Sequence, residues 1–324
     1  MALTINTNLS SMVAQKNLGK ATVDLNKAIE RMTTGYKINH ASDNAAGHSI
    51  AKNWETKLSS LDVAADNAAT GADMLATLED NSSLITSHLQ RVRDLTEQAA
   101  NGTYGLDSLK SIEAEIAARL EEIIRISSNA EFNGLNLMDG TLTSGVSLQV
   151  GLDSSDNSII DLDADLFADS SLKGLFNGLT VPGATKTITE LINAGNGGTA
   201  IAAANYNTEA GIRAIASACA GLQYKSSAFS KGGDAKDMLA YLDAAISKIS
   251  DKTTQIGAAQ NRIDSAIESI AVQSENITSS LSTLRDADVA KESSNYIKSQ
   301  ILQQAAATLL STANQSPSIA LNLI

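Results

Sequence analysis

One apolar pattern constrains the fold of this chain more than any other feature. From Leu239 to Leu284, positions taken in alternating steps of three and four residues are mostly large aliphatic side chains. Such a heptad repeat is typical of a helix that buries one stripe against partner helices. The span contains no proline and one glycine, Gly257, and a helix of this length would be roughly 70 Å long. The pattern predicts a rod, with a long helix in an ordinary bundle as the alternative.

Composition narrows the classes of protein to which such a chain can belong. The formal net charge is −12, which disfavours a nucleic-acid partner held by neutralising phosphates. Aromatic residues make up 3% of the chain, too few for the usual small-molecule pocket. No apolar run has the length of a membrane span, and residues 1–15 lack the charged and apolar regions of a cleaved secretion signal. We expect neither nucleic-acid binding nor membrane insertion.

The N-terminal half predicts three helices. The first begins near Ser11, ends near Gly35 and is followed by a hinge over Ile38 to Gly47. A second, long helix runs from about Gly47 to Ala99 and shifts its heptad register after Leu75. A third, over Asp107 to Ser127, packs antiparallel on the second because Gly102 and Gly105 allow the chain to reverse. The seam of the first helix consists of Ala14, Leu18, Ala21, Leu25, Ala28 and Met32.

The C-terminal half adds a change of period and two more helices. Apolar residues alternate at Val146, Leu148, Val150 and Leu152 and again at Ile160 and Leu162, which predicts a β-hairpin. Residues 166–235 form an insert rich in turn residues, with one helix over Thr208 to Leu222. After the rod, residues 285–290 break the heptad seam, and a last helix runs until Pro317 stops it.

The whole pattern is mirror-like and predicts a mainly α fold. We expect a long antiparallel helical bundle or coiled coil with paired terminal helices, a small β-hairpin region and a small α+β or irregular inserted domain. Residues 1–45 and 287–324 would form the terminal-helix domain. Residues 46–165 and 236–286 would form the helical rod with its hairpin, and 166–235 a variable, surface-exposed insert.

A search for enzymatic chemistry finds no constellation of residues. The three histidines His40, His48 and His88 are isolated, and no metal-ligand spacing is present. Asp161, Asp163 and Asp165 imitate the start of a calcium-binding loop, but Leu166 and Leu172 occupy the positions that require Gly and Glu. We therefore expect no catalytic residues, no metal and no cofactor.

The single cysteine, Cys219, excludes an intramolecular disulfide. We interpret it as an incidental free thiol. An exposed thiol that crosslinks two copies of the chain is the alternative interpretation.

The two ends of the chain predict self-association. Residues 1–15 and 299–324 carry no charged side chain, which suggests that both ends are meant to be buried. Terminal helices with small and polar seams would be only marginally stable as an isolated pair, so we expect them to become ordered when many copies bury them together. The candidate polymerisation residues are Leu18, Leu25, Met32, Ile297, Ile301, Leu302 and Leu309.

Several sequence blocks carry a family resemblance. The blocks INTNLSSMVAQKNL, IERMTTGYKINHASDNAAGHSIA, LQRVRDLTEQAANGT, LKSIEAEIAARLEEIIRISSNAEFNGLNLMDG, AAQNRIDSAI and YIKSQILQQAAATLLSTANQSP resemble bacterial flagellin over residues 1–165 and 236–324. The resemblance implies that the terminal helices form the inner tube of a filament, that the rod and hairpin form the outer tube, and that the insert faces solvent.

The same resemblance implies a location and a set of partners. The chain would be exported unfolded through the flagellar type III channel, without a cleaved signal peptide, and would reside in the extracellular flagellum. Its partners would be further copies of itself, the flagellar cap and hook–filament junction proteins, and an export chaperone.

A host protein is a further implied partner. In similar flagellins, the surface that matches Gln90, Arg91, Leu95 and Glu115 contacts the Toll-like receptor for flagellin and also packs between subunits. This chain has Asp94 where Glu is more usual in the family, which keeps the charge. Bundle packing and a solvated helix face are the alternative roles of Leu95 and Glu115.

Two alternative functions and one stability hypothesis remain. A hook–filament junction protein shares the terminal helices, and a secreted helical adhesin would need no polymerisation. Within the rod, Thr253, Gln260 and Ser274 interrupt the apolar seam, and we interpret them as residues that set its register. Replacing Gln260 by Leu should then stabilise the monomer without disturbing assembly.

Overall fold

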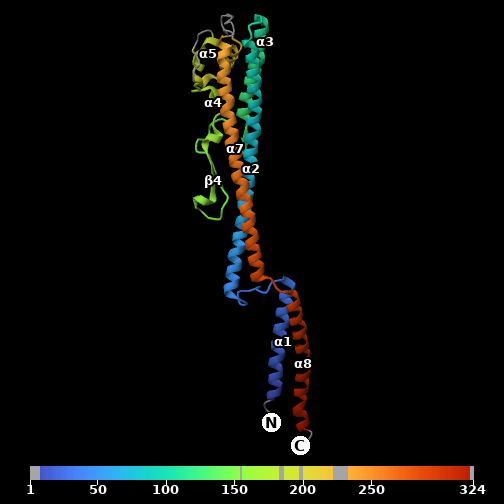
Figure 1. The fold of residues 1–324 in the computed structure, drawn as a ribbon. Coiled ribbons are helices and arrows are strands. Elements are labelled where there is room, and N and C mark those ends of the chain that lie inside the picture. The colour runs from blue at the N-terminus through green and yellow to red at the C-terminus, as the bar shows by residue number, and fades with distance from the viewer. Residues whose placement is uncertain (1–7, 154, 182–185, 197–199, 222–232, 322–324) are drawn as a thin grey trace. The chain divides into compact units, whose positions relative to one another are not determined.

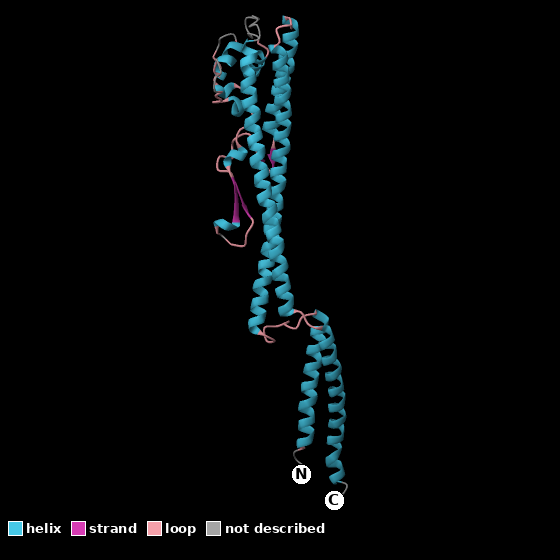
Figure 2. Cartoon of the chain, in the orientation of Figure 1, coloured by secondary structure: helices cyan, strands magenta, loops and turns pink. Residues whose placement is uncertain are grey.

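The computed structural model describes residues 8–153, 155–181, 186–196, 200–221 and 233–321, without the side chains of 233, 234 and 316–321. The chain divides into two compact units, residues 1–60 with 272–324 and residues 61–271. Figure 1 shows the chain and its element labels, and Figure 2 shows how much of it is helical. The elements are α1 Leu9–Thr34, α2 Ala45–Ala100, α3 Leu106–Asn129, β1 Glu131–Phe132, β2 Leu135–Asn136, β3 Val146–Gln149, η1 Asp156–Ser158, β4 Ile159–Leu162, η2 Ala164–Phe167, α4 Leu172–Phe176, α5 Ile188–Gly195, η3 Ala203–Asn205, α6 Glu209–Cys219, α7 Gly233–Arg285 and α8 Val289–Leu321.

The first unit is built on the antiparallel pair of α1 and α8 (Figure 1). Asn8 caps α1 by accepting the backbone N–H of Ser11 at 3.1 Å. Gly35 ends α1 with φ 75°, a left-handed conformation that suits glycine. At the start of α8, the Asp288 carboxylate accepts the N–H of Ala290 at 2.9 Å. Capping residues therefore set the ends of the two helices where the turn-rich stretches lie in the sequence.

One sequence expectation about α8 is wrong. Pro317 was expected to stop the last helix, but α8 continues to Leu321. Proline removes one backbone donor and crowds the preceding turn, which disfavours a helix interior, but its fixed φ of about −65° lies in the helical range, so it weakens this helix without ending it.

The second unit is a bundle of α2, α3 and α7, as the heptad patterns predicted. Every seam position of α7 is at least half-buried, and Leu242, Ile249, Ile256, Ile263 and Ile270 are fully buried. These buried residues recur at intervals of seven, so each heptad of α7 contributes one large aliphatic side chain to the core. On α3, the predicted face is buried as well: Leu109, Ile112, Ile116, Leu120, Ile123 and Ile126.

The register of α2 shifts earlier than predicted. Ala64 and Gly71 are buried in place of the expected Ala65 and Ala72, so the heptad shifts at Leu61 and then continues unbroken past Leu75. Gly71 was missed because it has no apolar side chain to count. A Cβ at Gly71 would lie 2.3 Å from the Leu148 side chain, which shows that the β3–β4 hairpin packs directly on α2 at this point.

Two antiparallel hairpins follow α3. The expected one pairs Val146 with Leu162 and Gln149 with Ile159, although β3 ends before the predicted Val150 and Leu152. The other, β1–β2, was not predicted because each of its strands is two residues long, too short for an alternating pattern to show. With φ of 49° at Asn133 and 82° at Gly134, the pair forms the left-handed turn that suits a two-residue hairpin.

The described part of the insert is helical, and α6 matches the predicted alanine-rich helix. We missed α5, whose start is marked by a capping box between Thr187 and Glu190. Ser217 on α6 donates a hydrogen bond to the carboxylate of Glu113 on α3. Cys219 is fully buried, and burial raises the pKa of its thiol to about 12, so the alternative of an exposed, crosslinking thiol is wrong.

Gln260 provides a test of the seam. Its amide donates to the Glu79 carboxylate at 2.8 Å, and Glu79 is exposed, so water can replace this bond. We predict that Gln260→Leu raises the free energy of unfolding of the monomer by about 1 kcal/mol, because an aliphatic side chain then fills the half-buried position. Urea denaturation would measure the change. Gln255→Leu, at an exposed position of α7, is the control, and an equal gain there would contradict the register hypothesis.

Candidate functional site: the terminal helix pair

Small side chains bring α1 and α8 together. Ala14, Ala21 and Ala28 are the buried residues of α1 and lie seven residues apart. They pack against α8, where Ser299 and Ala306 are buried at the same interval. Small residues allow a close approach of the two helices but bury little apolar area. The pair is therefore held closely without a large core of its own.

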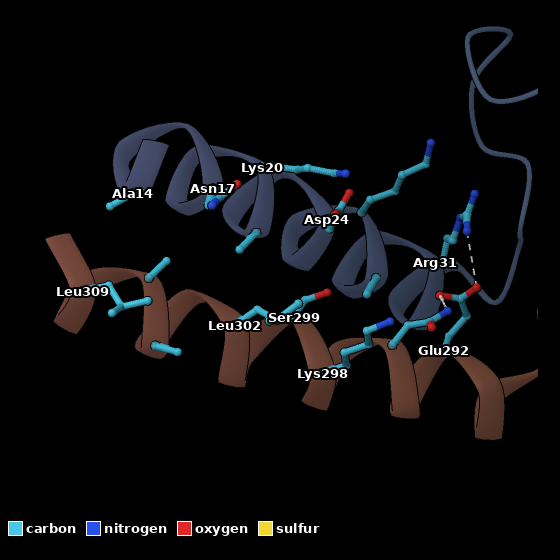
Figure 3. Close-up of a pocket in the computed structure, with 16 residues that line it drawn as sticks. Ala14, Asn17, Lys20, Asp24, Arg31, Glu292, Lys298, Ser299, Leu302 and Leu309 are labelled. Carbon is cyan, nitrogen blue, oxygen red and sulfur yellow. Dashed lines mark hydrogen bonds and ion pairs between the residues drawn. The ribbon is translucent and has the colours of Figure 1, made fainter. Parts of the chain in front are cut away.

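A groove of about 570 Å³ runs along one side of this pair (Figure 3). Charged residues line the groove from Lys20, near its middle, to Arg31 and Glu292 at one end, and Leu309 of α8 lies towards the other end. The complete lining is Ala14, Asn17, Lys20, Ala21, Asp24, Lys27, Ala28, Arg31, Glu292, Asn295, Lys298, Ser299, Leu302, Ala305, Ala306 and Leu309.

Polar contacts fix the register of the pair. Arg31 pairs with Glu292 at 3.3 Å, and Figure 3 draws this contact at the charged end of the groove. Glu292 is buried, at 7% exposure, and a carboxylate at that depth requires a charged partner. Hydrogen bonds also join the α1 side of the pair to α8: Gln303 Nε2 donates to Thr22 Oγ1 at 3.2 Å, Ser11 Oγ to Asn314 Oδ1 at 2.7 Å, and Nδ2 of the capping residue Asn8 to Ala313 O at 2.6 Å.

The predicted polymerisation residues fall into two groups. Leu18 and Leu25 are half-buried in the α1 seam. Met32 is partly exposed, at 38%, whereas the four α8 residues are at least half exposed, with Ile297 at 54%, Ile301 at 59%, Leu302 at 50% and Leu309 at 62%. The structure thus separates residues that help to pair the two helices from residues that remain available to another molecule.

Sequence reasoning missed a set of exposed apolar residues on α1. They escaped notice because they lie outside the heptad seam, and only the combination of apolar character and off-seam position could have indicated them. Exposed apolar residues concentrated on one part of a chain mark an interaction surface. The set consists of Leu9 at 68% exposure, Met12 at 61%, Val13 at 51%, Val23 at 65% and Ile29 at 43%.

The second candidate surface lies across α2 and α3. Arg91 donates to Glu115 Oε1 from Nε at 2.9 Å and from Nη2 at 2.8 Å, and both side chains are partly exposed. Gln90 is exposed beside them, whereas Leu95 is buried at 2% exposure. The structure therefore brings three of the four predicted residues to the surface and places the fourth in the bundle core.

The residues examined for metal or enzymatic chemistry lie apart. Within the described ranges, no group of three His, Cys, Asp or Glu side chains is placed to hold a metal ion. His40 contacts the Glu30 carboxylate at 2.8 Å on the surface. Asp161 accepts a hydrogen bond from Ser147 at 2.5 Å within the hairpin. None of the described helices combines the length and the apolar character needed to cross a membrane.

Long helices with exposed apolar ends are typical of a structural subunit that buries those ends against other chains. The family model for the bacterial flagellin N-terminal helical region matches residues 5–143, and that for the C-terminal helical region matches residues 239–324. Polar flagellin F of Vibrio parahaemolyticus is 30% identical, and polar flagellin A of the same species is 32% identical, each over 100% of both chains. A solved structure of FliC from Burkholderia pseudomallei is 18% identical, with a TM-score of 0.39, and the match covers 59% of this chain and 99% of that one.

These matches show that the chain belongs to the bacterial flagellin family. It is therefore a structural subunit of the flagellar filament, an extracellular assembly that serves motility.

Proposed function

We propose that the chain polymerises through the outward faces of α1 and α8. The observation that carries this proposal is the set of exposed apolar side chains on α8, Ile297, Ile301, Leu302 and Leu309, each at least half exposed. Transfer of such residues from water to a protein interface contributes about 1.5–3 kcal/mol for each fully buried side chain. Leu18 and Leu25 contribute indirectly, because they hold α1 against α8. Met32, which is partly exposed on α1, contributes to the edge of the assembly surface.

The three-part division of the chain fits this role. Residues 1–45 with 287–324 would form the inner tube, residues 46–165 with 236–286 the outer tube, and residues 166–235 the solvent-facing insert. The non-helical segments after α1 and before α8 support a boundary on each side of the terminal pair. The sequence predicted that the terminal helices become ordered only in the filament, whereas the structure pairs α1 with α8. Strong hydrogen-exchange protection of residues 1–40 in the monomer would contradict that prediction and favour a pair that is ordered before assembly.

Seeded elongation tests polymerisation directly. Purified monomer is added to short filament fragments, and length is followed by electron microscopy. A filament subunit should elongate the seeds into long filaments. A junction protein would bind the fragment ends without lengthening them, and an adhesin would leave the fragments unchanged. Either result would overturn the proposal.

Export and assembly partners follow from the same surfaces. We propose that the chain leaves the cell unfolded through the type III channel without loss of a signal peptide, and that a chaperone covers the apolar terminal helices beforehand. An exposed apolar surface of this kind invites aggregation unless it is covered. The cap and the hook–filament junction protein would then meet the same helices at the two ends of the filament.

We also propose that the paired side chains of Arg91 and Glu115, with Gln90, form a contact for the Toll-like receptor for flagellin. Two guanidinium N–H groups of Arg91 donate to one carboxylate oxygen of Glu115, which holds both side chains on a face that spans two helices. Leu95, at 2% exposure, would support this face from below and would not touch the receptor.

Receptor binding by the monomer gives the test. Arg91→Ala is expected to weaken binding about tenfold or more, because arginines at the centre of an interface often dominate its energy. Surface plasmon resonance with the receptor ectodomain would measure the affinity. Arg125→Ala removes a comparable exposed pair, with Glu122 on α3, and should leave binding unchanged.

Leu95→Ala is a poor probe of the same contact. It would open a cavity that costs about 2–5 kcal/mol of stability. If Arg91→Ala binds the receptor with wild-type affinity, the receptor proposal is wrong.

A further inference from the structure

The two non-helical segments of the first unit meet each other. Tyr36 and Asp286 form an antiparallel bridge. The Lys37 N–H donates to the Arg285 carbonyl at 2.7 Å, and the Ala287 N–H donates to the Gly35 carbonyl at 2.8 Å. The sequence suggested a hinge after the first helix and a break in the seam after the rod, but two backbone hydrogen bonds join these segments. Such a joint restricts φ and ψ on both strands at once.

Arg285, the last residue of α7, contacts both Tyr36 and Glu55 at this joint. Its guanidinium lies over the Tyr36 ring, 4.0 Å from the ring centroid, in the geometry of a cation–π interaction. The same group pairs with the Glu55 carboxylate on α2. The side chains of Arg285 and Glu55 are 20% and 30% exposed, so water screens this pair less than a surface pair.

Neighbouring contacts support the joint from both sides. Lys37 Nζ donates to the carbonyl of Thr283 in the last turn of α7 at 2.7 Å. Ile38 is buried at 5% exposure, and a Cβ on Gly47 would lie 2.9 Å from its Cδ1 atom. The segment that follows α1 is thus packed against the starting turns of α2 and bound to the end of α7.

We propose that Arg285 is a positioning residue for self-association: with Tyr36 and Glu55 it forms a latch that presents α1 and α8 to the next copy of the chain as one preoriented pair. The inference rests on the proposed function, in which α1 and α8 carry assembly. With the two segments joined, α1 and α8 change direction only together. Less orientational freedom is then lost when a second copy binds, which favours association without any new contact.

The first test uses only the free monomer. Hydrogen exchange at the Lys37 and Ala287 amides is compared in wild type, Arg285→Ala, Arg285→Lys and Arg262→Ala, the last an exposed arginine of α7. We expect protection to fall about tenfold or more in Arg285→Ala. Protection in Arg285→Lys should lie between the values for wild type and Arg285→Ala, because lysine keeps the charge but cannot stack a planar group on the Tyr36 ring.

Two controls separate the latch from general unfolding. Arg262→Ala should match wild type at both amides, and the Ile256 amide in the bundle should stay protected in all four proteins. Full protection of Lys37 and Ala287 in Arg285→Ala would overturn the latch.

The second test measures seeded elongation by the same four proteins. The critical monomer concentration should rise about tenfold in Arg285→Ala, less in Arg285→Lys, and not in Arg262→Ala. A variant that loses amide protection but elongates like wild type would overturn the positioning role. If wild type itself fails to elongate seeds, the proposed function fails, while the amide measurement still decides whether the latch exists.

Discussion

Seeded elongation is expected to stop when Ile301 is replaced by Asp, while the free chain keeps its fold. Ile301 is 59% exposed, so a carboxylate at this position stays hydrated in the monomer and costs little. In the filament we propose that the same position is covered by another copy. An unpaired carboxylate would then lose its water without gaining a partner, at a cost of several kcal/mol. Because each 1.4 kcal/mol is a factor of ten, the critical concentration should rise more than about a hundredfold.

Electron microscopy and sedimentation of the elongated seeds would measure this effect. Val63→Asp is a matched control, because Val63 has a similar exposure of 56% but lies on α2 in the other unit. Ile301→Leu keeps the apolar contact and should elongate at nearly the wild-type rate. Normal filaments from Ile301→Asp would mean that α8 does not present this face to its neighbour.

The bundle could be predicted from the sequence because its signal is strong and local. The α7 seam repeats a large aliphatic residue in every heptad, and the structure buries those residues. The same reasoning failed at Gly71, where burial arises from the approach of Leu148 in the hairpin. A rule that counts apolar side chains cannot detect a position that is buried because it has none.

The terminal pair shows a different limit of sequence reasoning. The inward stripe of α8 includes Glu292, Ser299 and Ala306, whereas the large aliphatic Ile297 and Ile301 point outward. The rule that apolar residues lie inside assigns these two faces the wrong way round. This is expected if the outward face of α8 is covered by another copy of the chain, as we propose. The latch was equally hidden, since Arg285 and Glu55 are 230 residues apart and no local pattern joins them.

Lys252 gives the bundle a pH dependence whose sign can be worked out. This α7 lysine is buried at 7% exposure and donates at 2.8 Å to the Ala168 carbonyl and at 2.8 Å to Ser170 Oγ. Burial lowers its pKa to about 8, against the opposing effect of Asp169 and with a smaller contribution from Lys248. Below that pH the folded state holds a desolvated charge. As pH rises through 8, the folded chain releases the proton while the unfolded chain keeps it, so stability rises with pH.

Replacing Lys252 by Met should remove this dependence. Relative to Lys252→Met, the wild-type free energy of unfolding should increase by about 2–3 kcal/mol between pH 7.5 and 10, because each pKa unit corresponds to 1.36 kcal/mol. Other titrating groups, including the Cys219 thiol, are common to both proteins and cancel in the difference. The Ala168 carbonyl still accepts from Ser170 Oγ at 3.1 Å, so Met leaves no backbone acceptor unpaired there. Urea denaturation across this range would measure the change, with Lys236→Met at an exposed position of α7 as the matched control. A difference that does not vary with pH would show that water reaches the Lys252 amine and that the bundle is more open at this point than its packing indicates.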